Sequence, residues 1–212
     1  MTTSCSPLLK CMGCEFNCDL NKNGDNSAND FHCGNKKLII WPDCNYFFKK
    51  SINDLVFKRM HCGLSGGVII VDFSMTNIAC FIQKEWLVNL EKMELKIILI
   101  ASQGMSSLAN FWMQRSNSIW SVIAAGGDIN DLCKKIKNSL SGSHHKSRSL
   151  RSMNEREVTI LQLLSEGTSN QEMARILECD TRDVYRFQYS LCKKLGSVGR
   201  LRNLHSLLSL SG

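Results

Sequence analysis

Short runs of apolar residues alternate with amphipathic segments through the middle of the chain. The apolar runs have the length of strands and fall at residues 38–41, 67–71, 96–100 and 119–125. The segments between and after them repeat apolar residues at helical spacing, over residues 46–60, 77–90, 106–115 and 129–140. Strands that are apolar throughout and separated by helices are typical of a parallel sheet covered on both faces. Residues 37–138 are therefore predicted to form an α/β domain, a parallel sheet with flanking helices.

The segments on either side of this domain follow other patterns. Residues 1–36 are rich in Asn, Asp, Cys and Gly and have almost no apolar periodicity, which indicates an irregular arm. Residues 139–152 are basic and rich in serine, which is typical of a flexible linker. From residue 153 to residue 212 the apolar residues recur at helical spacing. We therefore expect a separate all-α domain of four helices at the C-terminal end.

Start and stop signals place the first three of these helices. Each start is a capping residue followed three positions later by an acid, the spacing at which side chains satisfy free backbone amides. The pairs are Asn154 with Glu157, Ser169 with Glu172, and Asp180 with Asp183. Gly167 and Gly196 follow apolar stretches, as C-terminal stops do. With the short turn between the second and third helices, this spacing predicts a helix-turn-helix.

The third of these helices has an apolar side and a polar side. Its polar positions carry side chains that can reach DNA phosphates or base edges: Arg182, Tyr185, Arg186, Gln188, Tyr189, Lys193 and Lys194. In a major groove Arg pairs with guanine and Gln with adenine, while Lys near the far end holds a backbone phosphate. We therefore predict that this helix binds double-stranded DNA. The alternative is that the basic face is only solvated.

Charge and composition agree with a globular protein that binds a polyanion. The formal charge is +7, and residues 141–212 carry 11 Lys/Arg against 7 Asp/Glu. A basic excess attracts nucleic acid. The longest apolar runs are far shorter than a membrane span, and the first ten residues do not resemble a secretory signal. We therefore expect a cytoplasmic protein with no membrane partner.

The arm contains a group of cysteines with the soft ligands that zinc or an iron–sulfur cluster uses. These residues are Cys11, Cys14, Cys18 and Cys33, with His32 beside the last. The spacing only partly suits a metal, because His32 and Cys33 are adjacent and a second separated pair is lacking. In a chain without an export signal, the simpler interpretation is reduced thiols. We therefore predict no bound metal and no cofactor.

The C-terminal segments resemble the LuxR-type (GerE-like) DNA-binding domain of bacterial regulators. The resemblance rests on Asn154-Glu155-Arg156-Glu157-Val158, on Gly167 to Ala174 and on Lys194-Leu195-Gly196, and covers about the last 60 residues. It implies that Tyr185, Arg186 and Tyr189 face the bases.

The same resemblance implies roles for the neighbouring helices. Ser169 and Asn170 would contact the DNA backbone, and the fourth helix would form a dimer face through Leu201, Leu204 and Leu208. The third helix departs from the family, which usually has Thr, His and Asn where this chain has Asp183, Phe187 and Ser190. Asp183 costs DNA affinity unless it caps its own helix.

Two residues of the α/β domain resemble the phosphorylation residues of receiver domains. Asp72 ends one predicted strand, and Ser102 follows the next. Phosphoryl transfer also needs an acidic pair for Mg²⁺ and a lysine. Only Asp43 is available for the pair, and residues 124–128 contain no lysine. We therefore predict a degenerate receiver-like domain that is not phosphorylated at Asp72. No histidine pairs with a nucleophilic cysteine in a pocket-like motif, so we expect no enzyme.

The α/β domain itself resembles a narrower group, the enterobacterial common-pilus regulators (MatA/EcpR). The motifs are Ile40-Trp41-Pro42-Asp43, Ala109-Asn110-Phe111-Trp112 and the strand within residues 117–126. This resemblance implies a transcriptional activator of fimbrial, adhesion or biofilm genes, which would contact RNA polymerase. We therefore expect a sequence-specific DNA-binding homodimer. The alternative is an interaction protein that has lost DNA readout and pairs with another regulator.

Overall fold

The computed structural model describes residues 38–60, 67–141 and 152–196, the last five of the first range by their backbone alone. Four parallel strands form one sheet in chain order. They are β1 (Leu38–Trp41), β2 (Val68–Phe73), β3 (Lys96–Ala101) and β4 (Ile119–Ala124). The predicted parallel sheet is confirmed, and β2 extends two residues beyond the expected end.

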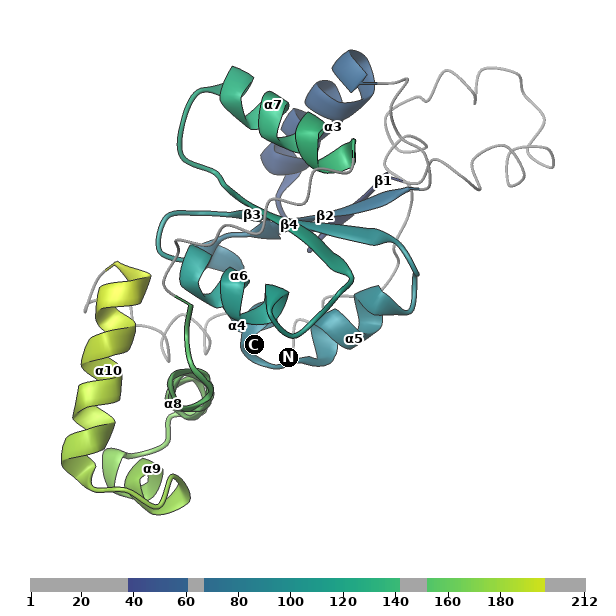
Figure 1. Cartoon of the computed structure of the whole chain (residues 1–212). Helices are drawn as coiled ribbons and strands as arrows, with labels where there is room; N and C mark the ends of the chain where they lie inside the picture. Colours follow the sequence, from purple (N-terminus) through teal and green to yellow (C-terminus); the bar gives the residue numbers. More distant parts are fainter. Residues whose placement is uncertain (1–37, 61–66, 142–151, 197–212) are drawn as a thin grey trace.

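Helices cover both faces of the sheet (Figure 1). On one face lie α3 (Tyr46–Met60) and α7 (Ile129–Leu140), which pack on alternate strand residues such as Ile40 and Ile98. On the other face lie α4 (Ile78–Ile82), α5 (Glu85–Glu91) and α6 (Ser106–Met113). Because side chains alternate along a strand, strands buried on both faces need the continuous apolar runs seen in the sequence. The α/β class follows directly from them.

The segment 77–90, predicted as a single helix, is two helices, and that prediction was wrong. A short 3-10 turn (Met75–Asn77) leads into α4, and Gln83 then has extended backbone angles, with φ −99° and ψ 159°. The carbonyls that a continuous helix would use find side-chain donors instead. Trp112 Nε1 donates to the carbonyl of Phe81 at 2.9 Å, and Gln162 Nε2 donates to that of Ile82 at 3.1 Å. The break is stabilised by contacts from distant residues, which helical periodicity does not reveal.

Three helices form the C-terminal helix-turn-helix. They are α8 (Glu155–Ser165), α9 (Asn170–Ile176) and α10 (Thr181–Leu195). Their N-caps are the three predicted residues, and Asn154 forms a complete capping box with Glu157. Asp180, in contrast, makes no side-chain capping bond. Gly196 ends α10 with a φ of 85°, the left-handed conformation that glycine adopts without strain.

Several predictions fall on residues outside the described part of the chain. They concern the fourth helix with Leu201, Leu204 and Leu208, the cysteines at positions 11, 14, 18 and 33, and most of the linker. Among the described residues, Cys44, Cys80, Cys133, Cys179 and Cys192 are free of disulfide bonds. No helix in the described ranges is both long and apolar enough to cross a membrane.

The helix-turn-helix packs against the α4 and α6 side of the α/β domain. The backbone amide of Met153 donates to the carbonyl of Ser107 at 3.1 Å, and Gln162 reaches across to α4 as described above. Gly104 abuts the end of α10, where a Cβ atom would lie 2.4 Å from the carbonyl oxygen of Leu195. One apolar cluster runs through both domains, from Phe81 to Leu195. The two domains therefore share a core.

Candidate nucleic-acid interface

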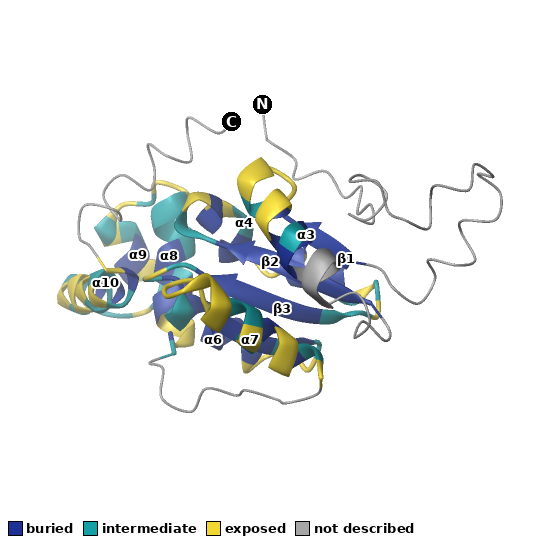
Figure 2. Cartoon of the chain, turned by 90° about the horizontal axis from the view of Figure 1, so that it is seen from above, coloured by how far each residue is buried: buried dark blue, intermediate teal, exposed yellow. Residues whose placement is uncertain are grey.

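The outer face of α10 is polar, basic and open to solvent. Its apolar side is buried against α8 and α9, while the residues at positions 182, 185, 186, 189 and 193 are exposed. With 3.6 residues per turn, these five positions lie on one face of the helix. Figure 2 shows the exposed outer side of α10 at the edge of the molecule. Docking on the α/β domain therefore leaves this face uncovered.

Two tyrosines dominate the middle of this face. The exposed fractions of Tyr185 and Tyr189 are 58% and 60%, which makes them two of the few large hydrophobic residues exposed in the described structure. They are four residues apart and therefore adjacent along the helix. The ammonium of Lys193 lies 4.6 Å from the ring centroid of Tyr189, a cation–π contact. This contact places a cation beside an exposed aromatic ring.

Asp183, the departure from the family that we expected to weaken DNA binding, pairs with Arg186. The distance from its Oδ1 to Arg186 Nη1 is 3.0 Å, and the arginine side chain is 80% exposed. Within the described residues, no capping bond from this carboxylate to α10 is seen, a role that the sequence analysis had left open. The ion pair offsets one negative charge on α10. It also leaves the other guanidinium N–H groups of Arg186 available to a ligand.

Gln188, which we expected to read adenine, does not belong to the exposed face. Its Nε2 donates to Asn170 Oδ1 at 2.7 Å and lies 3.9 Å from Met173 Sδ. We expected Asn170 to contact the DNA backbone, but its side-chain oxygen accepts this hydrogen bond from α10. The two amides connect α9 to α10 and fix the angle between them. Ser169 remains exposed, with its hydroxyl accepting from the amide of Glu172 at 3.3 Å.

Lys194, which we expected to hold a phosphate, points toward α8 instead. Its Nζ donates to Glu157 Oε2 at 2.6 Å and to the carbonyl of Ser152 at 2.9 Å. Glu157 is 1% exposed and accepts two more hydrogen bonds, from Ser190 Oγ at 2.6 Å and from the backbone amide of Asn154 at 2.8 Å. Ser190 is thus an internal partner of Glu157. The sequence identified Glu157 only as a capping acid and gave no sign of its burial.

Burial by itself raises the pKa of Glu157, because it disfavours the charged carboxylate. The hydrogen bonds from Lys194, Ser190 and Asn154, together with the charge of Lys194, outweigh that effect and hold the pKa below its ordinary value of 4.5. Glu157 is therefore ionised at neutral pH. It joins the start of α8 to the end of α10 and so supports the helix that presents the exposed face.

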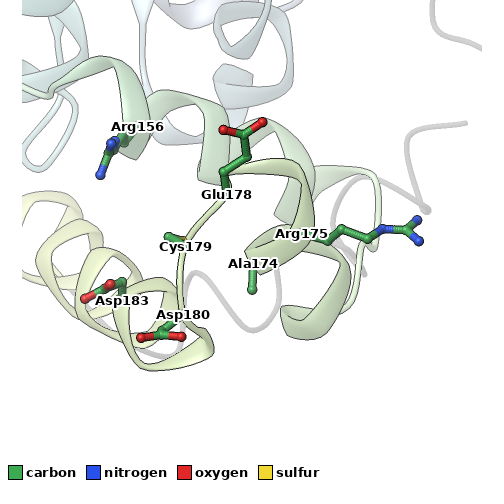
Figure 3. A pocket seen from close by; sticks show the side chains of 7 residues that line it. All are labelled: Arg156, Ala174, Arg175, Glu178, Cys179, Asp180 and Asp183. Carbon is green, nitrogen blue, oxygen red and sulfur yellow. The ribbon is translucent and has the colours of Figure 1, made fainter.

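An open hollow of about 660 Å³ lies beside the turn between α9 and α10 (Figure 3). Three carboxylates and two guanidinium groups line it, with Ala174 and Cys179: Arg156, Arg175, Glu178, Asp180 and Asp183. An excess of negative charge disfavours phosphate. The tyrosine side of α10 is therefore the better surface for DNA.

The receiver-like residues lie together at the carboxyl edge of the sheet, but they already have partners. Asp72 is only 3% exposed, and its Oδ2 accepts a hydrogen bond from Asn45 Nδ2 at 3.0 Å. Asp43 forms an ion pair with Lys49, whose side chain is buried. The hydroxyl of Ser102 accepts from the amide of Met75 at 3.2 Å. Within the described ranges, no three His, Cys, Asp or Glu side chains gather as metal ligands.

Two family models match separate parts of the chain. Residues 10–140 match the EcpR N-terminal domain family, and residues 151–205 match the bacterial regulatory proteins of the luxR family. The uncharacterized protein YqeH of Escherichia coli (strain K12) is 24% identical over 196 residues, which are 92% of this chain and 91% of that protein.

Two solved structures are similar at low identity. The full-length FixJ of B. japonicum is 17% identical, with a TM-score of 0.35, over 82% of this chain and 96% of its own. A structure of two RcsB dimers bound to two parallel DNAs is 19% identical, with a TM-score of 0.37, over 76% of this chain and 81% of its own.

The first family match covers more than half of the chain, and the second covers the helix-turn-helix. The luxR family consists of regulators and not of enzymes. The chain therefore belongs to the EcpR N-terminal domain family and, with its luxR-family domain, is a LuxR-type DNA-binding transcription regulator.

Proposed function

We propose that this regulator binds specific sequences of double-stranded DNA by inserting α10 into the major groove. The observation that carries the proposal is the exposed face of α10, with its cations and tyrosines. The proposed contacts are Ser169, Arg182, Tyr185, Arg186, Tyr189 and Lys193. Gln188 and Lys194 are left out because Gln188 Nε2 and Lys194 Nζ donate to partners inside the domain. Asn170 contributes by positioning α9 against α10.

We further propose that the protein acts as a homodimer in the cytoplasm. One copy of α10 can make only a few contacts with DNA. A dimer places two copies on neighbouring half-sites and so doubles the number of contacts. Leu201, Leu204 and Leu208 remain the proposed dimer residues. The resemblance of the α/β domain to the common-pilus regulators supports activation of fimbrial, adhesion or biofilm genes, with RNA polymerase as a partner.

A gel-shift titration of the full-length chain at several salt concentrations tests DNA binding. Arg182 and Lys193 are the exposed cations of α10 without an acidic partner on that helix in the described structure. With two such phosphate contacts per protomer, a dimer should give a slope of log K against log[salt] of about −4, or about −0.9 per contact. Unlabelled promoter fragments are then added as competitors. If some fragments displace the labelled DNA better than others, binding is sequence-specific.

Two single variants separate readout from charge. Arg186→Ala should weaken specific binding by about 1–3 kcal/mol and relax the preference at one base pair. Lys193→Ala should weaken binding to all sequences alike and reduce the salt slope by about 1. Equal losses on specific and nonspecific DNA for Arg186→Ala would instead identify Arg186 as a phosphate contact.

The second candidate is an interaction protein without DNA readout. Two observations favour it. The side-chain amide of Gln188 is bound to Asn170, and the carboxylate of Asp183 is paired with Arg186, so fewer side-chain groups on α10 are free to bind DNA bases. The same titration decides between the two functions. The absence of a specific band at every salt concentration would support the interaction protein.

A further inference from the structure

Resting on the proposed function, we propose that Tyr185 and Tyr189 are specificity-determining residues of α10 in addition to Arg186, and that they recognise the methyl groups of thymines in the major groove. The operator would then contain a pair of thymine positions that these two rings contact. The inference goes beyond DNA binding, because it names the base and the group on that base that the helix detects.

The first argument comes from what the exposed face lacks. Amide side chains read adenine through its N6 and N7 atoms. Gln188 is the one amide in α10, whose residues 181–195 are all described, and it is bound to Asn170. The exposed face therefore has cations and tyrosines for readout, and adenine has no amide partner on it.

The second argument comes from what the face offers. Tyr185 and Tyr189 are each more than half exposed, although large aromatic residues are on average well buried in folded proteins. The main apolar feature of the major groove is the thymine 5-methyl group, which apolar side-chain surface contacts. Two exposed rings on the groove-facing side match this feature and bury apolar surface on binding.

The third argument comes from spacing and from Lys193. Residues four apart are separated by about 6 Å along a helix axis. This is close to two steps of about 3.4 Å along one DNA strand, so the two thymine positions should lie within about two base pairs of each other. Lys193 lies over the ring of Tyr189 at 4.6 Å, which restricts the ring and places a cation near the phosphates that flank the contacted base.

The test begins with sites selected by the full-length chain from random duplexes. Each thymine of the selected site is then replaced singly by deoxyuridine, which removes only the 5-methyl group. Loss of one buried methyl corresponds to about a threefold to fourfold weaker affinity, from about 0.8 kcal/mol per group. We expect this loss at two positions in each half-site, no more than about two base pairs apart, and no loss at flanking thymines.

Tyrosine variants assign each position. At one of the two positions, Tyr189→Ala should bind the duplex with thymine and the duplex with deoxyuridine equally well. Tyr185→Ala should show the same equal binding at the other position. Tyr189→Phe and Tyr185→Phe keep the ring and should retain the methyl effect, which controls for the hydroxyl groups. Both tyrosine side chains are exposed in the wild type, so the fold should survive in all four variants, as circular dichroism can show.

The outcomes separate this inference from the proposed function. If the selection enriches no sequence, DNA readout itself fails. If sites are enriched but deoxyuridine has no effect, or has the same effect in the alanine variants, the tyrosines do not read thymine. If the alanine variants bind DNA normally but lose self-association, the rings belong to a protein interface, and the inference is overturned.

Discussion

Glu157→Ala should destabilise the protein strongly, although it changes a single residue at the start of α8. The substitution removes a buried carboxylate that accepts hydrogen bonds from Lys194, Ser190 and the amide of Asn154. In the intact protein the side chain of Lys194 is only 16% exposed, and the substitution leaves it with its hydrogen bond to the carbonyl of Ser152. Removal of one partner from a buried ion pair costs about 3–5 kcal/mol. Because Lys194 keeps that carbonyl and some contact with water, we expect the lower end, about 3 kcal/mol.

Urea unfolding of the full-length chain, followed by far-UV circular dichroism, measures this loss. The double variant with Lys194→Met should lose less than the two single variants together, by about 2 kcal/mol, because neither charge is then buried alone. Arg175→Met is a matched control. Arg175 pairs with Glu172 at the same 2.6 Å, but these side chains are 77% and 41% exposed. An exposed pair contributes about 0–1 kcal/mol.

The pH dependence gives an independent check of the same network. A group whose pKa is lower in the folded state than in the unfolded state stabilises the fold above its unfolded pKa. The advantage of the wild type over Glu157→Gln should therefore be full at neutral pH and shrink as the pH falls below 4.5 and through the folded pKa. If Glu157→Ala costs no more than Arg175→Met, or if the advantage grows in acid, the buried network is not what stabilises this domain.

Three further predictions follow from single positions. Glu178 has a φ of 50°, a conformation that strains residues other than glycine. Glu178→Gly should therefore raise the free energy of unfolding by about 1 kcal/mol, while Glu178→Ala should leave it unchanged. Equal effects of the two substitutions would argue against backbone strain. Both side-chain polar atoms of Asn110 are buried and have no hydrogen-bond partner among the described residues, so Asn110→Ala should leave stability unchanged or raise it. As a control on the same helix, Leu108→Ala should lower the free energy of unfolding by about 2–5 kcal/mol. A similar loss for Asn110→Ala would show that the amide of Asn110 does have hydrogen-bond partners. Acetyl phosphate with Mg²⁺ should not label the protein or change its DNA affinity, and labelling that Asp72→Asn abolishes would contradict this.

The features that the sequence predicted well are those set by neighbouring residues. The N-caps of α8, α9 and α10 lie at the expected residues. At α8 and α9 the capping side chain bonds to an amide three positions away, a signal that the local sequence carries. The strands were equally clear, since burial on both faces removes polar residues from the run. The break at Gln83 escaped prediction because its stabilising donors, Trp112 and Gln162, come from other helices.

The direction of the side chains at the border of the polar face of α10 could not be predicted from the sequence either. Gln188 and Lys194 lie between the buried and exposed sides of α10, where helical position alone allows either direction. The amide of Asn170 and the carboxylate of Glu157 draw them inward. Both partners are on other helices, so only the packing of α8 and α9 against α10 decides which polar residues remain for DNA.

The contact between the two domains determines how that remaining face is presented. Gly104 allows the end of α10 to approach so closely that any Cβ there would strike the carbonyl of Leu195. Gln162 closes the same interface by satisfying the free carbonyl of Ile82. Separation of the domains would expose the shared apolar core and leave these polar groups unpaired, which is costly. Yet Tyr189 and its neighbours on α10 are exposed while the domains are docked. In this arrangement DNA can reach α10 without domain separation, so we expect regulation to act through protein abundance, a partner or a ligand instead of through release of the helix-turn-helix.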